Sequence, residues 1–157
     1  MLWVGCDDNE IDEIRASQHG LPLPPEYEAF LRARGKGPRP DSYLRATGED
    51  WYYPEILGFG ELARQLFLEG AGTPLPEQYL VVSHYQGFQF MCVDPRSSTP
   101  LSVYRYMETH AAMEATDLDL ADLLTAAVDS DDKGPPYKSE HVGGGIYRLI
   151  YPDHDSD

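Results

Sequence analysis

Three short runs rich in β-branched and aromatic residues follow one another between residues 78 and 106. They occupy residues 79–84, 88–93 and 101–106, and the breaks between them hold turn-forming residues. The first break, Tyr85-Gln86-Gly87, is too short for a parallel connection, which needs a crossover of about a dozen residues or more. The pattern therefore predicts an antiparallel β-meander around which the rest of the chain is organised.

Apolar residues at helical spacing predict two helices before this meander. Asp7 and Glu10 resemble a capping box, so the first helix begins there, and Gly20 stands where a glycine ends a helix. Its thin apolar stripe includes Gln18. A second, short helix begins at Pro25, and its buried face is formed by Tyr27, Phe30 and Leu31.

Two further helices are expected, one before and one after the meander in the sequence. The third spans residues 61–69, with Leu62, Leu66 and Phe67 at helical spacing. The fourth has Thr116 as its N-cap and precedes a solvated loop at residues 129–136. Its apolar face is formed by Leu120, Leu123, Leu124 and Ala127. A short strand at residues 43–45 and a final strand at 146–151 complete the predicted elements.

These elements predict an α+β fold. The chain of 157 residues is long enough to close one core, so we expect a single domain over residues 1–152, with helices packed on one side of the meander sheet. Residues 153–157 form an acidic tail that we expect to be disordered. No run approaches the ~20 apolar residues of a membrane span, and the first residues lack the pattern of a signal peptide, which indicates a cytoplasmic protein.

The charge of the chain is strongly negative. Twelve basic and 27 acidic side chains give a net charge of −15, and residues 107–132 contain no Lys or Arg. The carboxylates of that segment are Glu108, Glu114, Asp117, Asp119, Asp122, Asp129, Asp131 and Asp132. Such a field aids solubility, repels nucleic acid and anionic membranes, and accelerates association with a cationic partner.

No pattern of catalytic or metal-binding residues stands out. Cys6, Cys92 and the five histidines lack the spacing of a metal or redox site, so neither a metal nor a cofactor is expected. Ser83 and His84 are adjacent on a strand and therefore point to opposite faces. The carboxylates of Asp117 and Asp122 lie on a helix expected to face solvent, an environment that suits neither a general acid nor a base. We therefore predict a protein that is not an enzyme.

Three consecutive aromatic residues, Trp51-Tyr52-Tyr53, form a predicted aromatic strand after a loop that is rich in glycine, proline and charge. In an extended chain neighbouring side chains point to opposite faces, so these rings cannot all share one face. Either both faces are covered by the core, or an aromatic ring is left exposed as a contact surface.

The segment Leu23-Pro24-Pro25-Glu26-Tyr27, followed by Phe30-Leu31 and by Gly35 or Gly37, resembles the signature of the SUKH superfamily. The resemblance extends in element order over residues 9–128. The family includes yeast cell-wall-synthesis regulators and many bacterial immunity proteins. The chain departs from the family pattern in its long loop at residues 35–50 and in its glycine-rich C-terminal strand.

This resemblance implies a non-enzymatic domain that binds a protein, commonly a toxin domain, often a nuclease, of a bacterial polymorphic toxin system. The negative charge fits a cationic partner of this kind. We predict an immunity protein, with a regulatory or scaffold domain that binds another partner as the alternative. The predicted partner-binding residues are Glu49, Asp50, Trp51, Tyr52 and Tyr53, followed by Tyr85 and Gln86.

Overall fold

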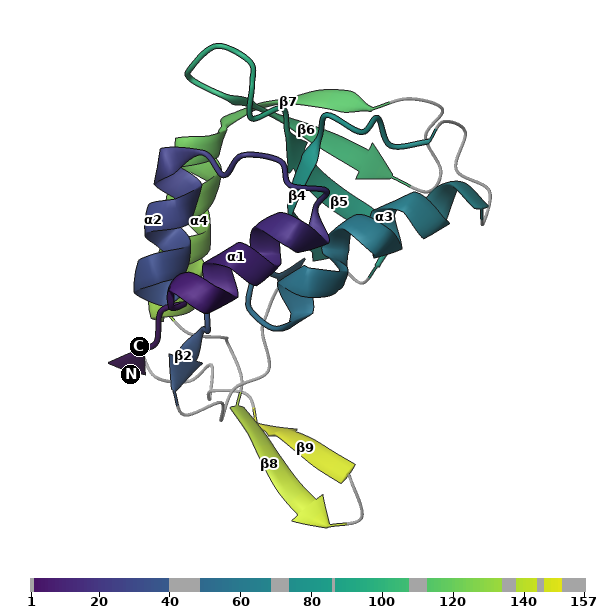
Figure 1. Ribbon diagram of the computed structural model, residues 1–157. Coiled ribbons are helices and arrows are strands. Elements are labelled where there is room, and N and C mark those ends of the chain that lie inside the picture. Colours follow the sequence, from purple (N-terminus) through teal and green to yellow (C-terminus); the bar gives the residue numbers. More distant parts are fainter. Residues whose placement is uncertain are drawn as a thin grey trace.

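A computed structural model describes residues 2–39, 49–68, 74–85, 87–107, 113–133, 138–143 and 146–150 (Figure 1). Its helices are α1 (Asp8–Ser17), α2 (Pro25–Arg34), the 3-10 helix η1 (Glu55–Gly58), α3 (Phe59–Leu68) and α4 (Leu120–Lys133). Its strands are β1 (Leu2–Trp3), β2 (Pro38–Arg39), β3 (Glu49–Asp50), β4 (Leu80–Tyr85), β5 (Gln89–Val93), β6 (Ser102–Met107), β7 (Glu114–Asp119), β8 (Lys138–Gly143) and β9 (Ile146–Ile150).

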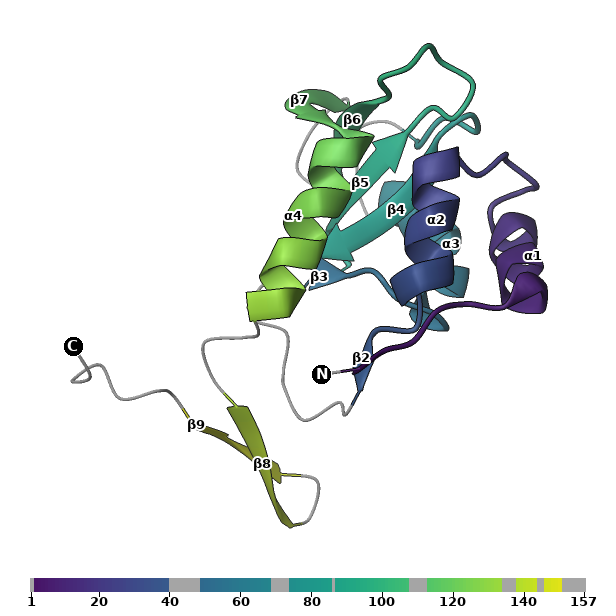
Figure 2. The same cartoon turned by 90° about the vertical axis from the view of Figure 1, so that its left-hand side faces the viewer.

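The main sheet is antiparallel and has five strands in the order β3-β4-β5-β6-β7. Strands β4 to β6 confirm the predicted meander to within one residue at each end. The helices contact this sheet: α3 lies against β4, and α4 runs along β6 and β7 beside α2 (Figure 2). The α+β class is therefore confirmed. Strands β8 and β9 pair only with each other in the described chain, outside this sheet (Figure 1).

Burial along the meander is uneven. In β5, Phe90 to Val93 are buried without alternation, so both faces of this central strand are covered. At the end of the sheet where β4 turns into β5, His84, Tyr85 and Gln89 are only half-buried. The core therefore stops short of the β4–β5 hairpin.

The start of α1 confirms the predicted capping box. The Asp7 carboxylate accepts a hydrogen bond from the Glu10 amide at 2.8 Å, and the Glu10 carboxylate accepts one from the Asp7 amide at 3.0 Å. The helix ends one residue earlier than predicted. His19, with a φ of 58°, follows the C-cap Gln18, and the Gly20 amide donates to the Arg15 carbonyl at 2.9 Å.

The side chain of Gln18 links the end of α1 to the sheet. It is buried, its amide nitrogen donates to the Val81 carbonyl at 2.7 Å, and its amide oxygen accepts from the Val81 N–H at 2.8 Å. The side chain thus provides β4 with the hydrogen bonds of a neighbouring strand. Val81 lies where the β4–β5 register shifts, and β3 pairs only with the far end of β4.

The N-terminal segment crosses α2 at very close range. The Cys6 amide donates to the Leu31 carbonyl at 2.8 Å, and a Cβ on Gly5 would lie 1.6 Å from the Arg32 carbonyl oxygen. Helix α2 itself confirms the sequence prediction: it begins at Pro25, and its buried residues are Tyr27, Phe30 and Leu31.

The prediction of the fourth helix was wrong at both ends. Residues 114–119 form β7, because they pair with the open edge of β6, and the Thr116 hydroxyl donates to the Val103 carbonyl at 2.8 Å. The N-cap is Asp119, whose carboxylate accepts from the Asp122 amide at 2.8 Å. The helix then continues to Lys133, into the region predicted as a loop.

The third helix begins at Phe59, two residues before the predicted start. Its buried residues include Phe59, Ala63 and Leu66, whereas Leu62 is 41% exposed. Strand β9 confirms a strand over most of 146–151. The strand predicted at 43–45 and the tail predicted at 153–157 lie outside the described residues. Among the described helices, none is long and apolar enough to cross a bilayer.

Two buried cysteines and a buried tyrosine make stability sensitive to alkali. Burial raises the pKa of Cys92 and Tyr27 well above their usual ranges, and it raises that of Cys6 to about 11. The folded chain keeps these protons at a pH where the unfolded chain, with a cysteine pKa near 9.0, has released them. The stabilisation is complete below that pH and is lost as the pH rises.

We therefore expect the free energy of unfolding to fall above about pH 9, by up to about 1.4 kcal/mol per pH unit for Cys92, and Tyr27 should add to the decline above about pH 10. Urea unfolding between pH 8 and 10.5 measures the slope. The Cys92→Ala variant should show a shallower decline, whatever its stability at pH 8. An identical slope would show that the Cys92 thiol does not contribute.

Candidate partner-binding site

The sheet brings together two groups of residues that the sequence placed apart. In the β3–β4 pairing, Glu49 lies opposite Tyr85, and Asp50 lies opposite His84. This pairing lies at the end of the sheet where the last residues of β4 and the first residue of β5 are only half-buried. The backbone of Glu49 on β3 therefore lies beside that of Tyr85 on β4.

A row of residues crosses four strands at this end. Tyr85 lies opposite Gln89, which in turn lies opposite Met107 on β6. Directly opposed residues share one face of a sheet, so Glu49, Tyr85, Gln89 and Met107 form a continuous row, which we call the hairpin-end row. With strands about 4.8 Å apart, the row is about 14 Å long. Tyr85, Gln89 and Met107 are half-buried.

An aromatic pair lies at the β4–β5 turn and includes Tyr85 of this row. The rings of Tyr85 and Phe88 meet edge to face, with centroids 5.3 Å apart and planes at 89°. Both side chains are half-buried, and the Phe88 amide donates to the Tyr85 carbonyl at 3.2 Å, which closes the turn. Sequence reasoning missed Phe88 and Gln89 because it placed them inside a strand, and it missed Met107 because the third strand was predicted to end at residue 106.

Trp51 and Tyr52 lie in the core. They are 4% and 1% exposed, and both rings contact Phe30 of α2, at centroid distances of 6.3 Å and 6.4 Å. Strand β3 ends at Asp50, so the strand predicted over residues 51–53 is absent and both rings turn inward. In the free chain they support α2 and offer little ring surface to a partner.

Tyr53 is held by its own chain. Its hydroxyl donates to Glu13 Oε2 at 2.7 Å, and the Lys36 ammonium lies 5.9 Å from its ring centre. The hydrogen bond to the Glu13 carboxylate raises the pKa of Tyr53 to about 12. Gln86 lies outside the described residues, as do the side chains of Glu49 and Asp50. Tyr85 is thus the predicted ring that the structure places in the hairpin-end row.

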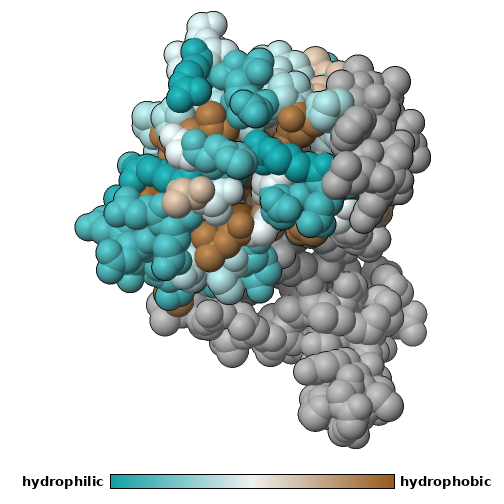
Figure 3. Space-filling view, turned by 45° about the vertical axis from the view of Figure 1, so that its right-hand side comes forward, coloured by the Kyte–Doolittle hydropathy of each residue, from teal (hydrophilic) through white to brown (hydrophobic). Residues whose placement is uncertain are grey.

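The carboxylates of α1 and α2 are largely paired. Arg15 contacts Asp12 at 3.0 Å and also Glu28, and Arg32 contacts Asp8 at 2.6 Å. These cations offset the negative charge of this side of the molecule. On the face shown in Figure 3, hydrophilic residues predominate and hydrophobic ones form small, separate patches.

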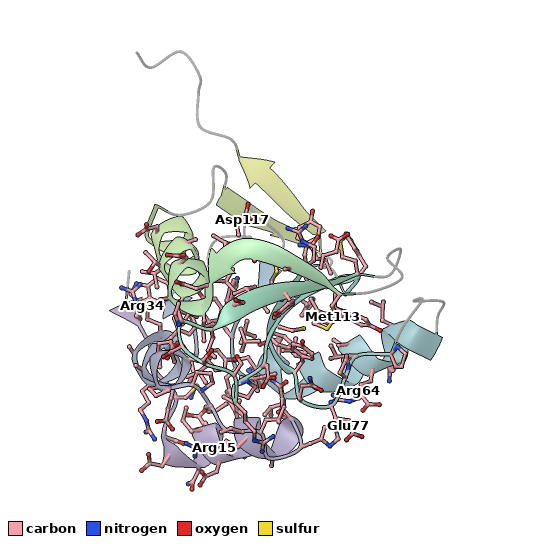
Figure 4. The ribbon with its side chains drawn as sticks, turned by 90° about the horizontal axis from the view of Figure 1, so that it is seen from above. Arg15, Arg34, Arg64, Glu77, Met113 and Asp117 are labelled. Carbon is pink, nitrogen blue, oxygen red and sulfur yellow. The ribbon has the colours of Figure 1, made fainter. Side chains whose placement is uncertain are left out.

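The negative charge concentrates instead on the edge strand β7 and the first turn of α4. We call this surface the acidic edge, and it consists of Glu114, Asp117, Asp119 and Asp122. On this edge, Glu114 forms an ion pair with Arg105 at 3.9 Å. In Figure 4, Asp117 on β7 and Arg15 on α1 lie on opposite sides of the molecule. The absence of Lys and Arg from residues 107–132 already indicated this segment.

The acidic edge and the hairpin-end row begin at the same end of the sheet. Glu114 lies opposite Arg105, two residues before Met107 on β6. The edge also carries Leu118, a 39% exposed apolar side chain. An aromatic pair, a row of half-buried side chains and the carboxylates of the acidic edge therefore form a connected surface suited to contact a positively charged protein.

A separate open cleft of about 460 Å³ is lined by His19, Leu21, Glu77, Gln78 and Arg96. The lining includes an imidazole and a carboxylate, but no Ser, Cys or Lys that could act as a nucleophile. In the described part of the chain, no three His, Cys, Asp or Glu side chains gather as a metal site would require.

Comparison with known protein families decides the family. The pattern of the SMI1 / KNR4 family (SUKH-1) matches residues 5–125, which is most of the chain. The chain belongs to this family. The SUKH-1 match covers β3 to β7 and therefore includes both the hairpin-end row and the acidic edge, and it ends within α4. Strands β8 and β9 lie beyond the SUKH-1 match. No curated protein matches the chain.

Proposed function

We propose that this SUKH-1 chain is a non-catalytic immunity protein that binds and neutralises a cationic toxin, such as a nuclease, of a bacterial polymorphic toxin system. Family membership supports a protein partner, and the net charge of −15 supports a cationic one. The single observation that carries the proposal is the connected surface of acidic edge and hairpin-end row, because it places carboxylates of a segment without Lys or Arg at the same end of the sheet as an aromatic pair.

The two parts of this surface have different roles. The carboxylates of the acidic edge attract a basic partner over distances of about a Debye length and so increase the rate of association. A nuclease presents a cationic groove for phosphates, which such carboxylates can occupy. The rings of Tyr85 and Phe88 then provide the desolvated contact that holds the complex, since a few aromatic residues commonly dominate binding energy.

Replacing Tyr85 with alanine should weaken the complex about 30-fold, because a central aromatic anchor is commonly worth about 2 kcal/mol. Calorimetric titration with the purified product of the neighbouring gene measures this loss. Leu62→Ala is the control, because Leu62 is also an exposed apolar side chain but lies on α3. Equal affinities for wild type and Tyr85→Ala would place the anchor elsewhere.

Neutralisation itself is tested in cells. Co-expression of the wild-type chain should restore growth to cells that produce the toxin domain, and Tyr85→Ala should restore it less well. Binding without protection would favour the regulatory or scaffold alternative. No binding at all by the wild-type chain would contradict the proposed function.

A further inference from the structure

His84 directly precedes Tyr85 in β4, and its ring packs against the core. Its imidazole meets the Phe59 ring edge to face, with centroids 4.9 Å apart, and it lies 5.8 Å from Phe90. Neighbouring residues of a strand point to opposite faces of the sheet. The His84 ring therefore points towards the core, and the Tyr85 ring points to the opposite face. The position of the imidazole is therefore set by α3 and β5.

The same imidazole binds the turn that follows. Its Nδ1 accepts a hydrogen bond from the Gly87 amide at 3.1 Å, while the Phe88 amide donates to the Tyr85 carbonyl. Gly87 has a φ of 77°, a conformation that glycine adopts without strain. The last two residues of β4, His84 and Tyr85, thus accept hydrogen bonds from the backbone amides of Gly87 and Phe88. Without His84 Nδ1, the Gly87 amide would be left to water, which does not fix a turn.

We propose that His84 is a positioning residue, whose core-held imidazole fixes the Gly87 amide and so presents the rings of Tyr85 and Phe88 together to the partner. This inference rests on the proposed function, because it gives the hairpin-end row its pre-organised form. A pre-organised loop binds more tightly, since less conformational freedom is lost in the complex.

Two substitutions separate the hydrogen bond from the packing of the ring. His84→Phe keeps an aromatic ring against Phe59 and Phe90 but has no acceptor. His84→Asn loses the ring but places Oδ1 at the same number of bonds from Cα as Nδ1. Amide exchange of Gly87 in the free protein, followed by NMR, measures the hydrogen bond directly.

In His84→Phe, exchange of the Gly87 amide should accelerate at least about tenfold, while His84→Asn should stay within about threefold of wild type, although it is less stable. The same order should appear in titrations with the partner, where His84→Phe binds about tenfold more weakly and His84→Asn recovers most of the affinity. Unchanged Gly87 exchange in His84→Phe would overturn the positioning role, and so would faster exchange with unchanged affinity.

The two proposals fail in different experiments. If the wild-type chain binds no partner, the proposed function fails in that titration, whereas Gly87 exchange in the free protein still shows whether His84 holds the turn. If the wild-type chain binds and His84→Phe behaves as wild type in both measurements, the positioning role alone is contradicted.

Discussion

Replacing Gly5 with alanine should destabilise the chain by more than about 4 kcal/mol, a large part of the roughly 5–15 kcal/mol that stabilises a typical domain. A Cβ at this position would lie 1.6 Å from the carbonyl oxygen of Arg32 and 2.5 Å from its carbonyl carbon. Both atoms belong to the backbone of α2, so no side chain can rotate to make room. The helix would have to move away from the N-terminal segment, which would break the hydrogen bond between Cys6 and Leu31.

Urea unfolding, or the yield of soluble protein if unfolding cannot be measured, checks this prediction. Gly58→Ala is the matched control, because its Cβ would meet no heavy atom within 4 Å, and its stability should stay within about 0.5 kcal/mol of wild type. A Gly5→Ala chain as stable as Gly58→Ala would show that the segment does not pack against α2 as described.

Replacing Gln18 with leucine should lower the free energy of unfolding by about 2 to 5 kcal/mol, although the two side chains have similar volumes. The Gln18 amide both donates to and accepts from the backbone of Val81, and all of these groups are buried. Leucine leaves the N–H and the carbonyl of Val81 without these partners, and an unsatisfied buried group costs about 1 to 3 kcal/mol.

Chemical denaturation of Gln18→Leu measures this cost. Gln65→Leu on the exposed face of α3 serves as the control and should change stability by no more than about 0.5 kcal/mol. If the two variants were equally stable, another group would have to satisfy the backbone of Val81.

Local sequence signals predicted the elements that are determined by residues close to one another in the sequence. The capping box at Asp7 and Glu10 and the turn-separated meander are of this kind, since cap and strand signals extend over a few residues. The apolar stripe of α1 also placed Gln18 on the buried side. The hydrogen bonds of this side chain to Val81 could not be predicted, because the two residues are 63 positions apart and no local pattern encodes such a contact.

The start of α4 shows how tertiary pairing can override a local signal. Residues 114–119 carry Thr and Asp in positions typical of a helix cap, and their acidic composition is unusual for a strand. The open edge of β6 nevertheless pairs with them, and the helix begins one turn later at Asp119. The length of the acidic run was visible in the sequence, but its position on a sheet edge was not.

The candidate site was predicted in part for the same reason. Tyr85 could be predicted because a hairpin tip follows from the turn residues alone. The pairing of Glu49 with Tyr85 could not, because β3 has two residues and a helix separates it from β4. Burial of Trp51 and Tyr52 was one of the two alternatives that the sequence left open, and their contacts with the ring of Phe30 show that it holds.

The rate of association with the neighbouring gene's product, measured by stopped flow at several salt concentrations, tests the central claim most directly. Reversing two charges of the acidic edge, with Glu114→Lys and Asp117→Lys, should slow association at least about tenfold at low salt. Reversing two paired charges of α1, with Asp8→Lys and Asp12→Lys, should slow it much less, and both differences should shrink as salt screens the field. Equal rates for the two double variants, or rates that do not depend on salt, would contradict the account.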